Sequence, residues 1–310
     1  MAPKLTQHYE SVIIDSRRWN DFQPREGDVV ISTSYKGGTT WMQGICGTLI
    51  FQSPEAPGEL DSFSPWVDAI FEPVEELLAR LEEQQHRRYL KTHLPLTALP
   101  YYPQCQYIFV GRDGRDIFMS MWNHWHNFNP EVRKMINEDP NRRGPKFADP
   151  PESAGAAFND WISKSTFPWE QDGFPFWSHH YHAQTWWEHR KLDNVLHVHF
   201  QDLLDDLDGQ MRRISAFLDI PVDEEIWPAL VDSMTFGEMK KNAATRAPGA
   251  NKGIWKDDKN FFHKGTNRRW DGVLSAEQLE RYDAVLHDLV EPSLYRWLTH
   301  STGFLDPKTL

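Results

Sequence analysis

The chain has 310 residues, of which 39% are hydrophobic and 25% are charged. Such a length and composition are typical of a globular protein with a substantial core, and they exclude a disordered chain. The net charge of −12 argues against binding nucleic acid through a broad basic face, so an anionic ligand would need a local cluster of cations. The two cysteines, Cys46 and Cys105, are too few for a disulfide framework and lack metal-ligand spacing.

The N-terminal segment lacks the basic-then-apolar pattern of a secretory signal. Apolar runs also stay well short of the roughly 18 to 20 residues that span a bilayer. We therefore expect a cytoplasmic protein with no membrane span. Internal repeats and Gly/Ser linkers are absent, which predicts a single domain over 1–310 with its core at about 28–290.

Four short apolar runs, partly β-branched, predict buried parallel strands at 28–32, 88–91, 107–110 and 195–200. Segments with helical spacing lie before, between or after them, at 39–51, 74–85, 115–126 and 203–218. Strands that alternate with helices predict an α/β fold, in which a parallel sheet is flanked by helices on both faces.

Two stretches interrupt this alternation. Residues 128–151 contain five prolines among polar residues, so they cannot form one regular helix, and long excursions of this kind are usually lids or surface segments. Residues 161–187 are dense in aromatic side chains. We expect Trp186 and Trp187 to pack in the core, whereas for Trp169 to Trp177 both a pocket lining and plain core packing stay open.

The segment 33–41, TSYKGGTTW, follows the first strand and runs into a helix. A strand, a glycine-containing turn and a helix N-terminus together form a phosphate-binding geometry, although a simple turn before a helix would look the same. Lys36 adds a point charge, and the threonines add hydroxyl donors. In the loop of nucleotide triphosphatases the lysine follows the glycines. Here Lys36 precedes Gly37 and Gly38, so this is not an ATPase or GTPase loop.

Three further polar residues lie near the expected carboxyl edge of the sheet. Arg112 follows the third strand, and Ser120 lies in the second turn of the next helix, so both could face one anion. His93 follows the second strand in the segment KTHLP. A histidine in that place is a candidate general base, although a hydrogen-bonded structural histidine is an equal alternative.

Four segments, TSYKGGTTW, KTHLP, VGRDGRDIFMS and FFHKGTNRRW, occur in this order between about residues 29 and 270. Together they resemble the cytosolic sulfotransferase family, and the layout is especially similar to bacterial members such as mycobacterial glycolipid sulfotransferases. The resemblance implies a P-loop-kinase-like fold. It also implies 3′-phosphoadenosine 5′-phosphosulfate (PAPS) as sulfuryl donor, 3′,5′-diphosphoadenosine (PAP) as product, and no metal. The group His179, His180 and His182 likewise lacks a standard zinc spacing.

The resemblance assigns roles to individual residues. His93 matches the catalytic base, Lys36 the lysine that assists departure of the bridging oxygen, and Lys91 a lysine near the sulfuryl group. The implied donor site comprises Lys36, Gly37, Gly38, Thr39, Thr40, Trp41, Arg112, Ser120, Phe236, His263, Lys264 and Gly265.

Three positions depart from the family pattern. Gly37 replaces a serine, His263 replaces an arginine, and Phe200 stands where relatives often have a tyrosine. The dimerisation motif of vertebrate relatives is only partly present, so the oligomeric state is left open.

We interpret the chain as an enzyme that moves a sulfuryl group to a hydroxyl of an apolar small molecule or a glycolipid, by in-line attack assisted by His93. The aromatic density and the excursion suggest that 128–180 forms the acceptor side. Two alternatives are a nucleotide-dependent phosphotransferase, which would need Mg²⁺, and a non-catalytic nucleotide-binding protein of the same fold. Which acceptor is used lies beyond the sequence, because specificity in such folds depends on loops.

Overall fold

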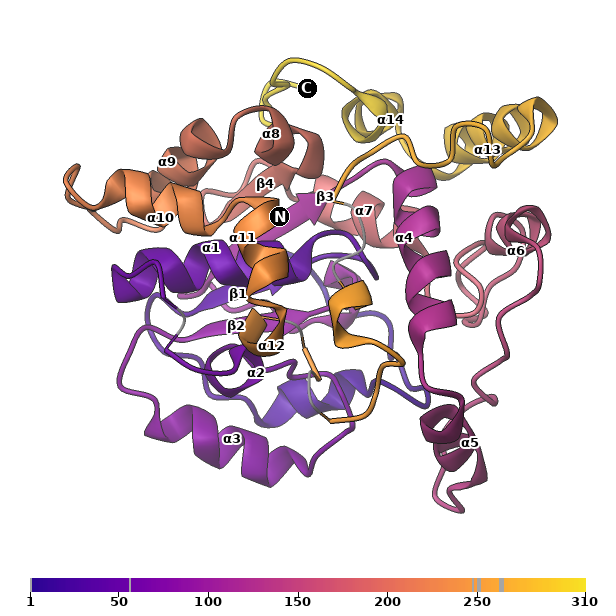
Figure 1. The fold of residues 1–310 in the computed structure, drawn as a ribbon, viewed down its shortest axis with the longest axis horizontal. Coiled ribbons are helices and arrows are strands. Elements are labelled where there is room, and N and C mark those ends of the chain that lie inside the picture. Colours follow the sequence, from indigo (N-terminus) through magenta and orange to yellow (C-terminus); the bar gives the residue numbers. More distant parts are fainter. Residues whose placement is uncertain (1, 56, 247, 250–251, 262–264) are drawn as a thin grey trace.

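The computed structural model describes residues 2–55, 57–246, 248–249, 252–261 and 265–310. Within them, four strands form a parallel sheet of order β2-β1-β3-β4 (Figure 1). The strands are β1 (Val29–Ser32), β2 (Tyr89–Thr92), β3 (Gln106–Gly111) and β4 (Val195–His199). Each predicted strand is confirmed to within one residue at either end. In the register, Val30 of β1 lies opposite Leu90 of β2 and Tyr107 of β3.

The sheet is buried on both faces, which is why its strands have nearly continuous apolar sequences. In β3, Tyr107 and Phe109 belong to one hydrophobic cluster, while Ile108 and Val110 belong to a second. This alternation follows from the two-residue period of side chains along a strand. The predicted α/β fold with helices on both faces is therefore confirmed.

The helices of the first half are η1 (Ser16–Asp21), α1 (Thr39–Phe51), α2 (Leu60–Phe63), α3 (Val74–Glu83), η2 (Leu96–Ala98), α4 (Gly114–Asn127), α5 (Pro130–Glu138), α6 (Ala154–Trp161) and α7 (His179–Trp187). Those of the second half are α8 (Phe200–Asp205), α9 (Leu207–Phe217), α10 (Trp227–Ser233), α11 (Phe236–Lys241), α12 (Ala243–Arg246), η3 (Asp258–Phe261), α13 (Ala276–Leu289) and α14 (Pro292–Thr299). Helices α1, α9 and α10 supply the core of one face of the sheet, and α4, α7, α13 and α14 that of the other. None of the described helices is both long and apolar enough to cross a bilayer.

One predicted helix is wrong. Residues 203–218 do not form a single helix, because the chain breaks at Asp206 between α8 and α9. Asp206 has the non-helical angles φ −148° and ψ 73°, and its side chain accepts a hydrogen bond from the backbone N–H of Gly209. An aspartate that caps a helix N-terminus in this way satisfies an amide that the helix itself cannot.

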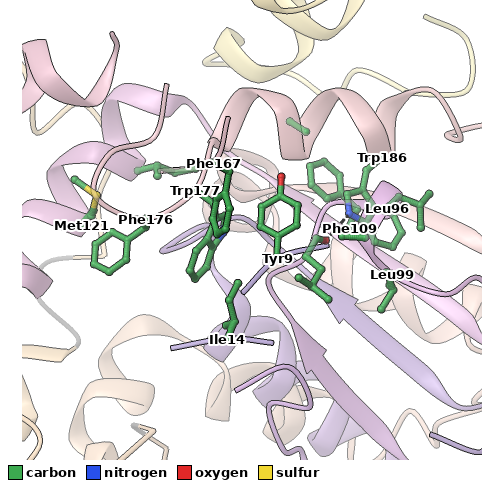
Figure 2. Packing of buried hydrophobic residues seen from close by; sticks show 14 of the residues in the cluster. Tyr9, Ile14, Leu96, Leu99, Phe109, Met121, Phe167, Phe176, Trp177 and Trp186 are labelled. Carbon is green, nitrogen blue, oxygen red and sulfur yellow. Dashed lines mark hydrogen bonds between the residues drawn. The ribbon is translucent and has the colours of Figure 1, made fainter. Parts of the chain in front are cut away.

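The aromatic segment belongs to the core. Trp186 and Trp187 are fully buried, as predicted, and the ring of Trp186 stacks on Phe109 of β3. Figure 2 shows this pair on one side of Tyr9, with Trp177 and Phe176 on the other. Phe176 and Trp177 are also buried, so core packing is the correct one of the two readings for these residues.

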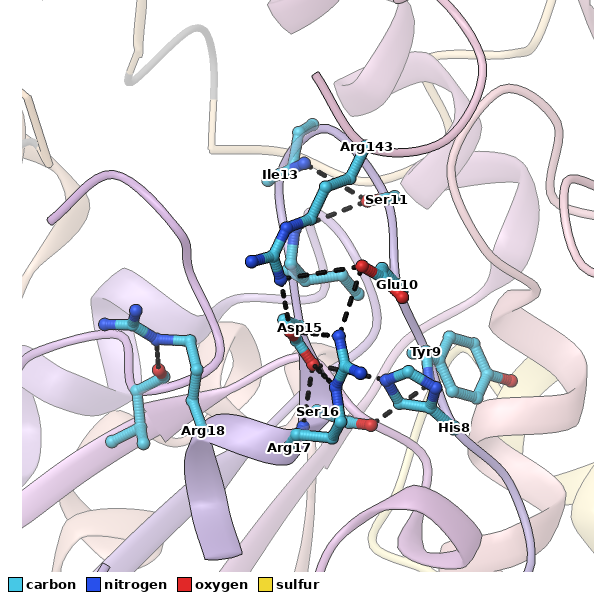
Figure 3. Close-up of polar contacts among 12 residues, drawn as sticks. His8, Tyr9, Glu10, Ser11, Ile13, Asp15, Ser16, Arg17, Arg18 and Arg143 are labelled. Atoms are coloured by element: carbon cyan, nitrogen blue, oxygen red, sulfur yellow. Dashed lines mark hydrogen bonds and ion pairs between the residues drawn. The ribbon is translucent and has the colours of Figure 1, made fainter. Parts of the chain in front are cut away.

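The excursion at 128–151 contains a helix of its own, α5, which begins at Pro130 and is capped by the side chain of Asn129. Figure 1 shows α5 beyond the end of α4, at the periphery of the molecule. Arg143 fixes the excursion to the N-terminal segment, because its guanidinium pairs with Asp15 at 2.5 Å and with Glu10 at 3.5 Å (Figure 3). The excursion is therefore held in place over the body of the protein.

A buried ion pair joins the end of α14 to α8. His300 Nε2 lies 2.9 Å from Asp202 Oδ1, and both side chains are more than nine-tenths buried. Burial alone would lower the pKa of His300, but its hydrogen bonds to Asp202 and to the carbonyl of Trp297 outweigh that effect and raise it. The end of the C-terminal helix is thus attached to α8 by a histidine whose protonated form is favoured.

We expect His300→Phe to lower the free energy of unfolding by about 3 kcal/mol at pH 6, because it leaves Asp202 buried without its cation. A raised histidine pKa stabilises the fold below the unfolded pKa, and this contribution is lost as the pH rises through the folded value. The difference between wild type and variant in urea unfolding should therefore shrink between pH 6 and pH 9. A difference independent of pH would contradict the ion pair.

Candidate active site

A cavity of about 740 Å³ opens at the carboxyl edge of the sheet. Its lining includes Lys36 from the loop after β1, His93 just after β2, and Arg112 just after β3. Parallel strands bring the segments that follow them to one edge, so residues far apart in the sequence converge there. The three polar positions predicted from the sequence therefore share one cavity.

The loop between β1 and α1, residues 33–38, lines part of this cavity through Lys36 and Gly38. Lys36 and Gly38 both have left-handed backbone angles, with φ of 65° and 111°, and α1 begins directly afterwards. A Cβ on Gly38 would lie 2.9 Å from the ring of Phe200, so the close packing of that ring requires a glycine. The free N–H groups of the first turn of α1, beside Thr39 and Thr40, give this part of the cavity its capacity to hold an anion.

Gly37 is placed differently from its neighbours. It does not line the cavity, and a Cβ there would meet the side chain of Thr33 at 3.1 Å and the carbonyl of Ser34 at 3.3 Å. A side chain at this position would therefore point into the loop. A serine here would require these neighbours to move by a few tenths of an ångström.

Arg112 is held ready to bind an anion by neutral groups. Its guanidinium donates hydrogen bonds to Asn267 Oδ1, at 3.0 Å from Nε and 2.8 Å from Nη2, and lies 3.9 Å from the centre of the Phe200 ring. Asn267 in turn donates to Gln201. Burial lowers the pKa of Arg112 to about 10, with Asp116 opposing this and Arg269 adding to it, so the guanidinium stays charged at neutral pH.

Gly265 and Phe236, predicted to bind the donor, contact each other at the rim of the cavity. Gly265 has φ +64°, and a Cβ there would overlap the ring of Phe236. Trp41 also lines the cavity, with its indole N–H donating to the carbonyl of Met234 at 2.7 Å. Such an arrangement of flat side chains around a glycine is suited to a planar base. His263 and Lys264 lie outside the described residues.

We expect Gly265→Ala to weaken PAP binding by about 10- to 100-fold, because the added methyl group must displace Phe236. Gly272→Ala is the matched control, since Gly272 has φ +71° but, apart from its chain neighbours, no described residue has an atom within 4 Å of the position of its Cβ. Both variants place an alanine in a left-handed backbone conformation, which is unfavourable. Only in Gly265→Ala does the new methyl group also overlap the Phe236 ring. Equal affinities of the two variants in calorimetric titration would contradict a role for this contact.

His93 is oriented as a base. Its Nδ1 lies 2.8 Å from the carbonyl oxygen of Thr33, and because a carbonyl only accepts, Nδ1 carries the proton and Nε2 of the neutral ring carries a lone pair. Burial, and then the charge of Lys91, lower the pKa of His93 well below its usual value. The ring is therefore neutral at physiological pH and able to accept a proton.

The buried Lys91 and the partly buried Lys36 share the cavity with this histidine. Burial, followed by repulsion from Lys91 and Arg112, lowers the pKa of Lys36 to about 7. Burial also lowers the pKa of Lys91, although Asp61 and Asp68 oppose it, and its ammonium lies 4.5 Å from the centre of the Trp66 ring. Three cations that line one cavity, Lys36, Lys91 and Arg112, are an arrangement suited to an anionic ligand.

The part of the cavity that is lined by α5 and Phe71, called the apolar end below, is mostly apolar, although Glu72 and Arg80, which form an ion pair, also line the cavity. Helix α5 contributes Val132, Met135 and Ile136, which its helical spacing places on one side. Phe71 and Met135 are each 65% exposed, so the lining continues to the outer surface. Further apolar lining residues are Ile13, Phe128, Phe147 and Ile254. Three aromatic lining residues, Trp66, Trp255 and Phe261, instead lie beside Lys91, His124 and Lys36. The aromatic residues between 161 and 187 do not line the cavity.

Most of the predicted site residues line the cavity: Lys36, Gly38, Thr39, Thr40, Trp41, Lys91, His93, Arg112, Ser120, Phe236 and Gly265. Sequence reasoning missed His124, which lies one turn beyond Ser120 on α4, and also Asn267. The spacing of four residues between Ser120 and His124 is a signal that could have found the first. The histidines 179, 180 and 182 bond within the protein instead, to Ser34, Asp172 and Ser32.

Comparison with known proteins assigns this site to a class. The model of the sulfotransferase domain matches residues 26–297. A glycolipid sulfotransferase of Mycobacterium tuberculosis is 33% identical over 312 residues, covering 96% of both chains, and one of Mycobacterium bovis is 32% identical with the same coverage. Human sulfotransferase 1E1 is 26% identical over 81% of this chain and 83% of its own. The chain therefore belongs to the sulfotransferase family and is a sulfotransferase.

Solved structures share the fold. Mouse sulfotransferase SULT7A1, crystallised with PAP, superposes with a TM-score of 0.67 at 21% identity, covering 91% of this chain and 92% of its own. Retinol dehydratase in a complex with retinol and PAP superposes with a TM-score of 0.67 at 20% identity, covering 89% of this chain and 84% of its own. The predicted sulfotransferase-type fold is thereby confirmed.

Proposed function

We propose that the protein transfers a sulfuryl group from PAPS to a hydroxyl group of an apolar small molecule or a glycolipid. One observation carries this proposal: a single cavity joins a cationic end at the N-terminus of α1 to an apolar end under α5, and His93 also lines it. A polyanionic donor and an apolar acceptor would meet at a base. The relatives named as glycolipid sulfotransferases support the choice of acceptor.

The donor site fits PAPS through its own chemistry. Arg112 and Ser120 would hold the 3′-phosphate, Trp41 and Phe236 would flank the adenine, and the loop from Lys36 to Thr40 would hold the phosphosulfate. Bound there, the donor would supply an activated sulfuryl group. The clustered charges of Lys36, Lys91 and Arg112 can offset its negative charge, so we propose that no metal takes part.

The chain's own residues then have distinct tasks. His93 Nε2 accepts the proton of the acceptor hydroxyl, which makes that oxygen a better nucleophile. The ammonium of Lys36 stabilises negative charge on the departing oxygen, and Lys91 stabilises charge near the sulfuryl group. Preorganised cations in a cavity that excludes water act more strongly than they would in solution. The apolar end positions the acceptor.

Sulfuryl transfer is favoured over the two alternatives. The lysine that precedes the glycines is unlike a triphosphate-binding loop, and family membership favours sulfuryl transfer over phosphoryl transfer. A cavity-lining histidine whose proton lies on Nδ1, which leaves a lone pair on Nε2, favours a catalytic role over simple nucleotide binding. The free, buried thiols of Cys46 and Cys105 fit a reducing compartment, which agrees with action in the cytoplasm.

The test is an assay with PAPS and paired acceptors, read by mass spectrometry of the products. The acceptors would be an alkanol, an alkyl glucoside of equal chain length, and the free sugar. We expect sulfated products from the alkyl compounds and little or none from the sugar, because only the alkyl compounds fill the apolar end. Sulfation of the sugar alone would contradict an apolar acceptor, and no sulfated product from any acceptor class would contradict the proposed function.

A further inference from the structure

His124 contacts the lysine on which the proposed chemistry depends. Its Nδ1 lies 3.3 Å from Nζ of Lys36, and both residues line the cavity. The contact joins two elements, because Lys36 lies in the loop after β1 and His124 lies in α4. Helix α4 also carries Ser120, one turn earlier on the same side. One helix therefore presents two polar residues to the donor end of the cavity.

The chemistry of the two groups decides which of them donates the hydrogen bond. A lysine ammonium can only donate, so Nδ1 of His124 must be the acceptor, and the neutral ring then carries its proton on Nε2. Burial, and then the charges of Lys36, Lys91 and His93, lower the pKa of His124 well below its usual value. Two adjacent buried groups cannot both be charged without strong repulsion. The stable state is a charged lysine and a neutral histidine.

Aromatic rings fix the position of the imidazole. The ring centre of His124 lies 4.4 Å from that of Trp255, 5.4 Å from that of Tyr35 and 5.6 Å from that of Phe261. Phe261 also packs against Lys36, whose Nζ lies 4.1 Å from its ring centre. A long, flexible lysine side chain in such a place gains a defined direction only from a fixed hydrogen-bond partner. His124 is that partner in the described part of the chain.

We propose that His124 is a positioning residue, which accepts a hydrogen bond from the Lys36 ammonium and thereby aims Nζ at the place where the departing oxygen of the donor forms. This role rests on the proposed function. It predicts that His124 acts through Lys36 and does not contact the acceptor. The effect of replacing His124 should therefore appear in kcat and in the protonation of Lys36, and not in the KM of the acceptor.

Two variants separate hydrogen bonding from packing. His124→Leu removes the acceptor atom but keeps an apolar side chain, whereas His124→Asn places an amide oxygen near the position of Nδ1. We expect the leucine variant to lower kcat by about 10-fold or more, as displacement of a catalytic group does, and the asparagine variant to recover most of the loss. In a Lys36→Ala background, His124→Leu should have little further effect, because the two residues act as a unit.

A second readout does not require turnover. PAP binding should draw a proton onto Lys36, and calorimetric titration at pH 7 in two buffers of different ionisation enthalpy measures that uptake. Without its hydrogen-bond acceptor, Lys36 loses its proton more readily, so His124→Leu should take up more protons than wild type. His124→Asn should take up as many protons as wild type. In the Lys36→Arg variant the uptake due to residue 36 should be absent, because arginine is already protonated.

Unchanged kcat and unchanged proton uptake in His124→Leu would overturn the proposal. So would a rise in acceptor KM that persists in the Lys36→Ala background, since it would mean that His124 contacts the acceptor. A failure of the proposed function looks different, because wild-type protein would then neither bind PAP nor form sulfated product. If His124→Leu does not fold, the test uses His124→Asn. A folded His124→Asn protein whose proton uptake on PAP binding differs from that of wild type would contradict the role.

Discussion

Replacement of His93 by alanine is expected to reduce kcat by about 10³-fold, because a positioned general base contributes about 10²- to 10⁴-fold to proton transfer. Nδ1 of the ring bonds to the Thr33 carbonyl, so Nε2 is the atom that would accept the proton, and alanine removes it. PAP affinity should change little. The measurement combines initial rates of product formation with calorimetric titration of PAP.

His287→Ala serves as the control for this variant, because His287 is an exposed histidine on α13, remote in sequence from the cavity lining. It should retain the wild-type rate. Turnover of His93→Ala within a fewfold of wild type, in a protein that still binds PAP, would remove His93 as the base. A loss of both turnover and PAP binding would instead indicate that the cavity has collapsed.

Replacement of Lys36 by methionine is expected to lower kcat by about 10²- to 10³-fold, as removal of a preorganised charge-stabilising donor does. Methionine keeps much of the side-chain volume but removes the charge and the hydrogen-bond donors of the ammonium, including the one that faces His124. The pKa of Lys36 is about 7 in the free protein because burial and the cations Lys91 and Arg112 destabilise its ammonium. An anionic donor placed among these cations favours the charged form and must raise that pKa.

The sign of the linked proton follows from this shift. Lys36 has a pKa of about 7 in the free protein and a higher pKa in the complex with PAP. At a pH between these two values, Lys36 is partly neutral in the free protein and charged in the complex. Binding of PAP therefore takes up a proton, and its affinity should fall as the pH rises above about 7. Lys36→Arg removes this component because arginine stays protonated. An affinity that rises with pH in wild type would contradict the assignment.

The architecture was predictable because each strand carries its own signal. Four buried runs and the helices beside them predicted the sheet to within one residue at each strand end. The break at Asp206 was not predicted, because the helical spacing of apolar residues continues across it. Asp206 ends α8 and caps α9 within that one segment. Tertiary contacts such as the Arg143 and Asp15 pair join segments far apart in the sequence, and no local pattern encodes them.

The site was predictable where its residues follow strands. His93 and Arg112 could be placed because the carboxyl edge of a parallel sheet gathers such positions. Side-chain partners could not be placed in this way. The contact of Lys36 with His124 and that of Arg112 with Asn267 depend on how α4 and the segment after residue 265 pack on the loops, which is a matter of three-dimensional distance.

The apolar lining of the cavity comes only in part from the segment 128–180. The excursion does contribute to the cavity, through Phe128, Phe147 and one side of α5. The dense aromatic residues at 161–187 do not, because they fill the space between the sheet and its helices. Composition alone cannot distinguish an aromatic residue that lines a cavity from one that packs in the core.

The most direct test of the account is a calorimetric titration of the protein with PAP, beside ATP with Mg²⁺, in wild type, Arg112→Ala and the exposed-site control Arg281→Ala. We predict that wild type and Arg281→Ala bind PAP tightly and ATP much more weakly. Arg112→Ala should bind PAP about 10- to 100-fold more weakly, because it loses charge-assisted hydrogen bonds to a phosphate. Absence of PAP binding, or binding that Arg112→Ala leaves unchanged, would contradict the donor site described here.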